Sequence, residues 1–378
     1  MTFHDDLTFL KKHVEVIVLN DDKDQAGIIV VPEWQGRVMT STASGKEGMS
    51  FGWINRELIA SGEIQKHINV FGGEDRFWLG PEGGQYSIFF KPGVPFEFDH
   101  WFTPAEIDTE PFEIVSRTQT SARFKKNMKL INYSGNIFEL NVRRDVNLFK
   151  ADEIGQKLGI TIGEGVQMVG YETENSITNT GSNSWTEKTG MLSIWILGMF
   201  NPSPKTTVVV PYKEGPESRL GKIVTDDYFG AISPERLKIQ EGILYFKADG
   251  ESRGKIGVSP GRAKPVMGSY DEENKVLTIV EYTLPPNVTR YVNSLWKFQK
   301  NPFAGDAANS YNDGPLDDGS QLGPFYELES SSPAAALAPG EVMRHTHRTF
   351  HFTGDRNQLN MIAKNLLGVG LDEIASAF

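Results

Sequence analysis

The sequence predicts an all-β fold of layered antiparallel sheets, and two observations support this prediction. Short apolar or apolar-alternating runs recur along all 378 residues and are separated by turn residues. Helical periodicity, in contrast, is clear only near the two termini. Because β sandwiches of this size form single domains and no linker interrupts the chain, we expect one domain over residues 1–378.

Short helices are expected at both ends of the chain. The first covers residues 5–13 and the second residues 355–367. In the second segment Asp355 can cap the N-terminus and Gly368 can end the helix. Its apolar positions follow the i, i+3, i+4, i+7 spacing of one helix face: Leu359, Ile362, Ala363 and Leu366.

The central segments show strand and hairpin patterns. Even-numbered residues of the run 138–148 are apolar and define one strand face, which Arg144 interrupts. The run 275–284 is apolar on both faces, which is typical of a strand buried between two layers, and the preceding residues 271–274 (DEEN) predict a hairpin turn. A second hairpin is expected around residues 240–242. The stretch 301–323 is rich in Gly, Asp, Asn and Pro, and predicts a long ordered loop close to a site.

Charge and composition exclude several classes of partner and chemistry. A net charge of −11 and a pI near 5.3 argue against nucleic acid and anionic membranes, which need a positive surface. No cysteine is present, so disulfides and thiolate chemistry are excluded. No apolar run reaches the length of a membrane helix, and the N-terminus is too charged for a signal peptide. The sequence as written predicts a cytoplasmic protein, or a periplasmic or secreted one if an export signal has been removed. Its oligomeric state is left open.

A polar loop that leads into a strand with two carboxylates is the most informative segment. Glu327 and Glu329 lie two residues apart and therefore point to the same strand face. Both could also be ordinary exposed strand residues. The segment 309–352, with its Pro-Gly-Glu turn at residues 339–341, resembles the C-terminal part of aldose epimerases and sugar-phosphate epimerases of the galactose-mutarotase superfamily. The resemblance implies a galactose mutarotase-like supersandwich with a sugar-binding cleft, in which Glu329 is the general base.

Three further segments resemble the same superfamily. In the Gly-rich stretch 72–86, Arg76 stands at the position of a sugar-binding arginine, with Trp78 and Glu82 nearby. The alternative is that Arg76 forms a purely structural ion pair with a neighbouring carboxylate, which would be Glu74, Asp75 or Glu82. Residues 98–118 place a family histidine on His100, next to Trp101.

Residues 174–200 resemble the strand pair that normally precedes a catalytic histidine. Here Ser193 occupies that position, with Trp195 close by. A serine hydroxyl cannot replace imidazole as a proton donor near neutral pH. This departure argues against ordinary mutarotase activity but not against carbohydrate binding.

Histidines alternate along the last predicted strand. His345, His347 and His351 share one strand face, where they could bind a metal or lie near the pocket. The glutamate and the second motif of a cupin metal site are missing, so no metal and no cofactor are expected. His345, like His100, is a candidate acid. Asn312, Glu327 and His347 complete the expected substrate-binding residues.

The sequence therefore supports two functions almost equally well. In the first, the chain is an aldose 1-epimerase-like isomerase acting on a small carbohydrate, with Glu329 as base and His100 or His345 as acid. In the second, it is a non-catalytic carbohydrate-binding protein whose tryptophans stack on the sugar. A structural or protein-binding role, and metal-dependent hydrolysis, are weaker alternatives.

Overall fold

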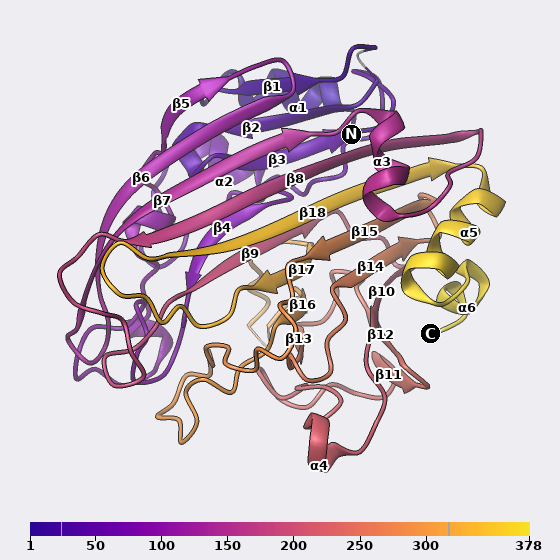
Figure 1. Cartoon of the computed structure of the whole chain (residues 1–378). Coiled ribbons are helices and arrows are strands. Elements are labelled where there is room, and N and C mark those ends of the chain that lie inside the picture. Colours follow the sequence, from indigo (N-terminus) through magenta and orange to yellow (C-terminus); the bar gives the residue numbers. More distant parts are fainter. Residues whose placement is uncertain (24, 317) are drawn as a thin grey trace.

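The computed structural model describes residues 1–23, 25–316 and 318–378, and antiparallel strands dominate these ranges (Figure 1). They form three sheets. A three-stranded sheet has the order β1 (Ile17–Asn20), β2 (Gly27–Val31), β3 (Arg37–Thr42). A ten-stranded sheet has the order β11 (Leu237–Gln240), β12 (Ile243–Lys247), β10 (Thr206–Pro211), β14 (Val266–Asp271), β15 (Val276–Tyr282), β18 (Val342–Gly354), β8 (Val166–Asn179), β7 (Ile137–Leu148), β6 (Ser121–Ile131), β5 (Glu113–Arg117). A five-stranded sheet has the order β13 (Gly254–Val258), β16 (Ala308–Asn312), β17 (Tyr326–Ser331), β9 (Ser193–Phe200), β4 (Arg76–Gly80). The predicted all-β fold of antiparallel sheets is confirmed.

The helices are short. They are α1 (Phe3–Leu10), α2 (Arg56–Ser61), α3 (Ala151–Leu158), α4 (Glu217–Leu220), α5 (Arg356–Leu367) and α6 (Leu371–Ala375), with 3₁₀ turns η1 (Pro32–Trp34), η2 (Phe98–His100) and η3 (Ala105–Ile107). The second predicted helix is α5: the side chain of Asp355 accepts from the Gln358 N–H, and Gly368 ends the helix in the left-handed region. The first begins and ends earlier than predicted, because Thr2 caps it. None of the helices in the described ranges is long and apolar enough to cross a membrane.

The ten-stranded sheet is covered on both faces. Apolar residues of α3, α5 and α6 pack with Phe350, Phe352 and their neighbours on one face, and these helices lie along the edge of the molecule in Figure 1. Toward the other face, the apolar residues of the ten-stranded sheet join two core clusters with residues of the five-stranded sheet. The five-stranded sheet therefore packs one face against the core, and its other face is available to form a binding site.

Several strand predictions are confirmed. Strand β15 is buried along almost its whole length, and the hairpins β14–β15 and β11–β12 close where the sequence predicts them. The even-numbered residues of β7 are buried as expected. Arg144 lies on that buried face because its guanidinium forms an ion pair with Asp75, at 2.5 Å between Nη2 and Oδ1, and also donates to the side chain of Asn175.

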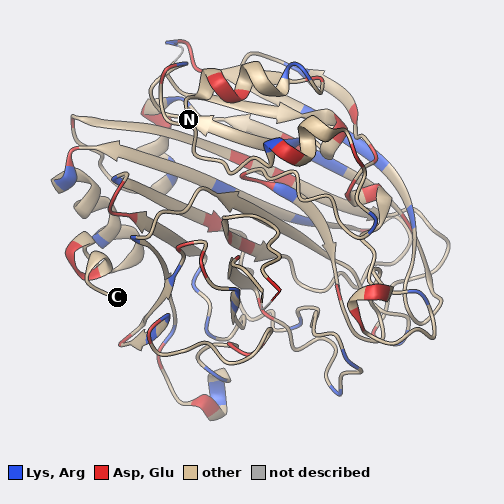
Figure 2. Ribbon diagram, turned by 180° about the vertical axis from the view of Figure 1, so that it is seen from behind, with Lys and Arg blue, Asp and Glu red and all other residues tan. Residues whose placement is uncertain are grey.

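The predicted loop over residues 301–323 is partly wrong, because strand β16 lies inside it; residue 317 of this stretch is outside the described residues. The polar composition was misleading since the polar side chains of β16 are buried and bonded. The hydroxyl of Ser310, for example, donates to the Glu327 carbonyl. Charged residues likewise occur on the central strands as well as on loops and helices (Figure 2).

Candidate functional site

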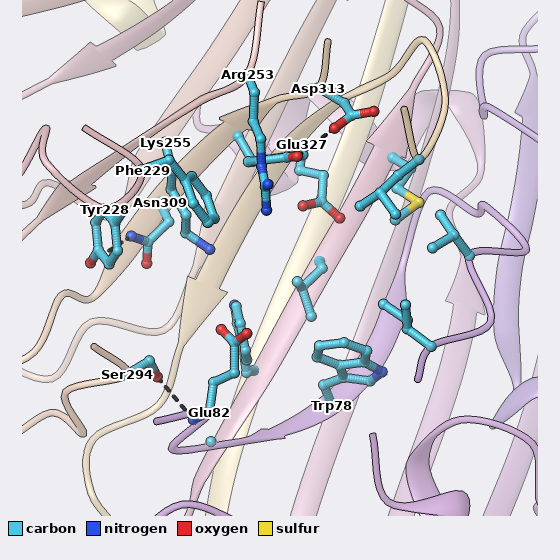
Figure 3. A pocket seen from close by; sticks show the side chains of 18 of the residues that line it. Trp78, Glu82, Tyr228, Phe229, Arg253, Lys255, Ser294, Asn309, Asp313 and Glu327 are labelled. Atoms are coloured by element: carbon cyan, nitrogen blue, oxygen red, sulfur yellow. Dashed lines mark hydrogen bonds between the residues drawn. The ribbon is translucent and has the colours of Figure 1, made fainter. Parts of the chain in front are cut away.

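A pocket of about 700 Å³ lies on the free face of the five-stranded sheet. Because successive side chains of a strand point to opposite faces, alternate residues of each strand form its floor. These floor residues are Arg76, Trp78 and Gly80 of β4, Ser193, Trp195, Leu197 and Met199 of β9, Glu327 and Ser331 of β17, Lys255 of β13, and Asn309 and Tyr311 of β16. Figure 3 shows side chains from these strands converging on one space, with Arg253 and Glu327 pointing into it.

Loops from distant parts of the chain form the walls. The wall residues of these loops are Phe98, Trp101, Tyr228, Phe229, Val292, Ser294, Leu295, Trp296, Asp313, Gly314, Leu316, Ser320, Gln321 and Leu322. The Gly-rich stretch packs tightly against one of these loops: a Cβ on Gly83 would lie 2.6 Å from the carbonyl oxygen of Leu295. Close backbone packing at this glycine brings the loop bearing Trp296 to the edge of the floor.

Glu327 is a buried carboxyl that lines the pocket. Its Oε1 accepts from Nη2 of Arg76 at 3.0 Å, and only 5% of the residue is exposed. Burial raises the pKa of Glu327 to about 8, because the attraction of Arg76 offsets only part of the cost of desolvating the carboxylate. A group with such a pKa can exchange protons near neutral pH.

Glu329 lies on the same side of β17 but beneath the pocket lining. The residue is fully buried, and Oε2 accepts from Nε1 of Trp195 and from Nζ of Lys255, each at 2.9 Å. Tyr326 and Leu328 point to the core, so the predicted alternation of this strand is confirmed and the interpretation of both glutamates as exposed is wrong.

Lys255 links this buried carboxylate to the pocket. Its Nζ lies 4.8 Å from the centroid of the Trp195 ring, and the side chain lines the cavity. Burial lowers the pKa of Lys255, but the carboxylates of Glu329, Glu82 and Glu327 more than compensate, so the pKa is raised overall. The pocket therefore contains a firmly protonated ammonium group close to Glu327.

Arg76 is placed in the pocket and does not form the alternative pairs considered from the sequence. Its guanidinium carbon lies 4.1 Å from the ring centroid of Trp78, and its ion-pair partner is Glu327. Glu74 accepts instead from Ser41, Tyr171 and His351, while Asp75 pairs with Arg144. These two carboxylates belong to the buried layer between the sheets.

The tryptophans and Glu82 also line the pocket. Trp78 and Trp195 meet edge to face, with ring centroids 5.6 Å apart, and Trp101 stacks on Trp296 at 5.7 Å. Glu82 accepts from Nε1 of Trp296 at 3.2 Å, and burial raises its pKa. Within the described residues, the indole N–H groups of Trp78 and Trp101 and the buried hydroxyl of Ser193 have no partner.

Other residues singled out in the sequence are absent from the pocket lining. His345 and His347 flank the hydroxyl of Ser330, each with a ring nitrogen 2.8 Å from it, and Ser330 points to the opposite face from Glu329. Burial lowers the pKa of His345 to about 3 and that of His347 to about 4. His345 is therefore brought neither to the pocket nor to Glu329, and both rings are neutral at pH 7.

Asn312 and His100 also lie apart from the lining. Asn312 is buried, accepts from the Gly250 N–H and donates to the Ser252 carbonyl, so it holds the segment before β13. His100 is half-buried in η2, although its neighbour Trp101 lines the pocket. His351 bonds to Thr278 and Glu74. In the described parts of the chain, no group of three or more His, Asp or Glu side chains is arranged to hold a metal ion.

Sequence reasoning missed several pocket residues, notably Lys255, Arg253, Trp296 and Asp313. They come from short strands and loops that are far apart along the chain. For Lys255 one signal exists: a single charged residue alternates with small and apolar residues in the run 254–258 (GKIGV), and the two neighbours that share its strand face are Arg253 and Gly257.

Comparisons with known proteins bear on the fold. A family model described as a family of unknown function (DUF6786) matches residues 1–378. No functionally curated protein matches the chain.

Solved structures of low sequence identity share its architecture. A protein from Escherichia coli K12 assigned to the aldose 1-epimerases is 14% identical, with a TM-score of 0.53 over 90% of this chain and 99% of that one. A protein from Synechocystis sp. PCC 6803 is 13% identical, with a TM-score of 0.53 over 90% and 96%. A galactose mutarotase-like protein from Lactobacillus casei ATCC 334 is 9% identical, with a TM-score of 0.48 over 89% and 100%. The two structures with TM-scores above 0.5 thus confirm the predicted fold.

Proposed function

We propose a function from the pocket itself, because the chain belongs to DUF6786, a family of unknown function. In this proposal the pocket binds a small free sugar, and the chain interconverts its anomers as an aldose epimerase-like isomerase. The observation that carries the proposal is Glu327, a carboxyl with a pKa of about 8 that lines a pocket walled by aromatic rings. Such a carboxyl is a stronger base than an exposed one, and tryptophan faces suit the C–H faces of a sugar ring.

Anomer exchange needs one group that removes a proton and one that supplies it. Ionised Glu327 takes the proton of the anomeric hydroxyl, and the bond between the anomeric carbon and the ring oxygen breaks. The ring oxygen receives a proton from the ammonium group of Lys255, which leaves an open-chain aldehyde, a protonated Glu327 and a neutral amine. Rotation of the aldehyde and reversal of both transfers close the ring as the other anomer. Arg76, which contacts Glu327, orients the carboxylate and keeps part of it ionised.

This assignment moves the base from Glu329, where the family resemblance places it, to Glu327. The reason is access: Glu327 lines the pocket, whereas Glu329 is fully buried and occupied by Trp195 and Lys255. In the proposed mechanism Glu329 positions the ammonium group of Lys255 and does not touch the sugar.

A non-catalytic carbohydrate-binding protein is the second candidate. The observation in its favour is Ser193, a pocket residue whose hydroxyl stands where the resemblance expects a catalytic histidine. In this alternative the rings of Trp78, Trp101 and Trp195 bind the sugar, and both carboxylates serve only to hold Arg76 and Lys255.

Two-dimensional exchange NMR on the anomeric protons of glucose, galactose and galacturonic acid separates these candidates. The epimerase proposal expects the wild-type protein to accelerate exchange for at least one sugar, and Glu327→Gln to reduce that rate by a factor of about 10² to 10⁴. Glu164→Gln, at an exposed site outside the pocket, is the matched control and should keep the wild-type rate. Binding without accelerated exchange would refute the epimerase proposal and favour the binding protein.

A further inference from the structure

The pocket is larger than a single sugar ring requires. A hexose has roughly a dozen non-hydrogen atoms, and even at the about 30 Å³ that a water molecule occupies in the liquid they would fill only about 360 Å³. The cavity of about 700 Å³ leaves about half of its space for a second group.

The large apolar residues of the pocket that are exposed to solvent lie on its loops, whereas its floor combines buried apolar side chains with buried charged groups. Arg76, Lys255 and Glu327 come from strands of the floor. Large apolar side chains that are exposed to solvent belong instead to the loops of the wall. They are Phe98 (55% exposed), Phe229 (50%), Leu316 (44%) and Leu322 (41%). Exposed apolar side chains gathered around one cavity indicate a binding surface.

A row of aromatic rings leads from the exposed Phe98 to Glu82, just after the end of β4. Phe98 lies nearly parallel to Trp101, with ring centroids 6.1 Å apart, and Trp101 stacks on Trp296. The indole N–H of Trp296 in turn donates to Glu82. An aromatic ring that is exposed beside a pocket, such as Phe98, can bind a sugar unit through the C–H face of the sugar. Phe229 and Tyr228 add aromatic surface at a second wall, as Figure 3 shows.

We infer that the pocket is built for a reducing disaccharide or longer saccharide, whose reducing-end ring lies on the charged floor and whose next unit packs against Phe98 and Trp101. This inference rests on the proposed function, because the reducing-end ring is the one whose anomers the floor would interconvert. It adds the substrate class: saccharides that still carry a free anomeric hydroxyl but extend by at least one unit toward the loops.

Calorimetric titration with two matched sugar pairs tests the inference: glucose against cellobiose, and galactose against 4-O-β-galactosyl-galactose. For at least one pair the disaccharide should bind about tenfold more tightly than the monosaccharide. Phe98→Ala should remove most of that difference. Phe378→Ala, which truncates an exposed phenylalanine outside the pocket, should have no effect on either sugar.

Exchange NMR on the same sugars separates failure of this inference from failure of the proposed function. If monosaccharide anomers exchange rapidly but the disaccharides bind no more tightly, the inference is overturned and the proposed function stands. If the disaccharides bind more tightly through Phe98 but no sugar shows faster exchange, the pocket is a saccharide-binding site and the enzymatic proposal fails. If Phe98→Ala weakens mono- and disaccharides equally, the extended site is refuted.

Discussion

The pKa of Glu327 gives the most direct test of its role as a base. With a pKa of about 8, about one tenth of the carboxyl is ionised at pH 7 and about one hundredth at pH 6. If ionised Glu327 removes the anomeric proton, kcat/KM should rise about tenfold from pH 6 to pH 7 and level off above about pH 9. Polarimetry of a freshly dissolved single anomer, corrected for the uncatalysed rate at each pH, measures this profile.

Substitution of Arg76 tests whether Glu327 is the group that titrates in this pH profile. Its guanidinium, bonded to Glu327 at 3.0 Å, lowers a pKa that burial raises. Arg76→Gln should therefore move the inflection to higher pH, and Arg76→Lys should return it toward the wild-type value. The reasoning is refuted if kcat/KM falls with rising pH, shows no inflection between pH 6 and pH 9, or keeps the same inflection in Arg76→Gln.

Three further predictions concern buried groups. Lys255→Met should lower the free energy of unfolding by about 3 kcal/mol or more, since Glu329 is left buried and unpaired. Adding Glu329→Gln to this variant should restore its stability but not its anomer exchange. If the double variant exchanges anomers at the wild-type rate, Lys255 is excluded as the proton donor. Arg144→Met should cost about 3–5 kcal/mol in urea unfolding by leaving Asp75 unpaired, and a loss below 1 kcal/mol would contradict this. His347 has a folded pKa of about 4, below its unfolded value, so its neutral form stabilises the fold above about pH 6.5 and this contribution falls toward pH 4. His347→Gln should therefore be about 2 kcal/mol less destabilising at pH 5 than at pH 7, and an equal effect at both pH values would contradict the prediction.

A matched control is available for the arginine variant. Arg143 precedes Arg144 on β7 but points to the exposed face, where it pairs with Asp145 at 3.3 Å. Arg143→Met should change the free energy of unfolding by less than about 1 kcal/mol. The contrast between the two arginines then measures the effect of burial at constant chemistry.

Local sequence patterns were sufficient for much of the fold. The hairpins, the buried strand β15 and helix α5 follow from apolar periodicity, turn residues and caps, all of which act over a few residues. Strand β16 was missed because its polar residues are bonded to partners from other strands, and no local signal reports such long-range pairing. That the chain forms one domain stays a prediction.

The site could be predicted only in part from the sequence, because it too depends on contacts between strands that are far apart along the chain. Strand alternation correctly put Glu327 and Glu329 on one face, yet it could not tell which of them lines the pocket. Which glutamate lines the pocket depends on Lys255 and Trp195, because these residues come from other strands and bond to Glu329. The histidines of β18 illustrate the opposite error. Their alternation suggested a site, but His345 and His347 are buried between the sheets and bond to Ser330.

The alternation of the five-stranded sheet also affects how this protein can diversify. Alternate residues of β9 and β4, and Glu327 and Ser331 of β17, face the ligand space, while most of the residues between them pack into the core. Substitutions at ligand-facing positions that make no buried ion pair should therefore change recognition with less effect on folding than substitutions at the core-facing positions between them. A combinatorial library restricted to the ligand-facing positions without a buried ion pair would sample many recognition surfaces while the core-facing residues stay unchanged.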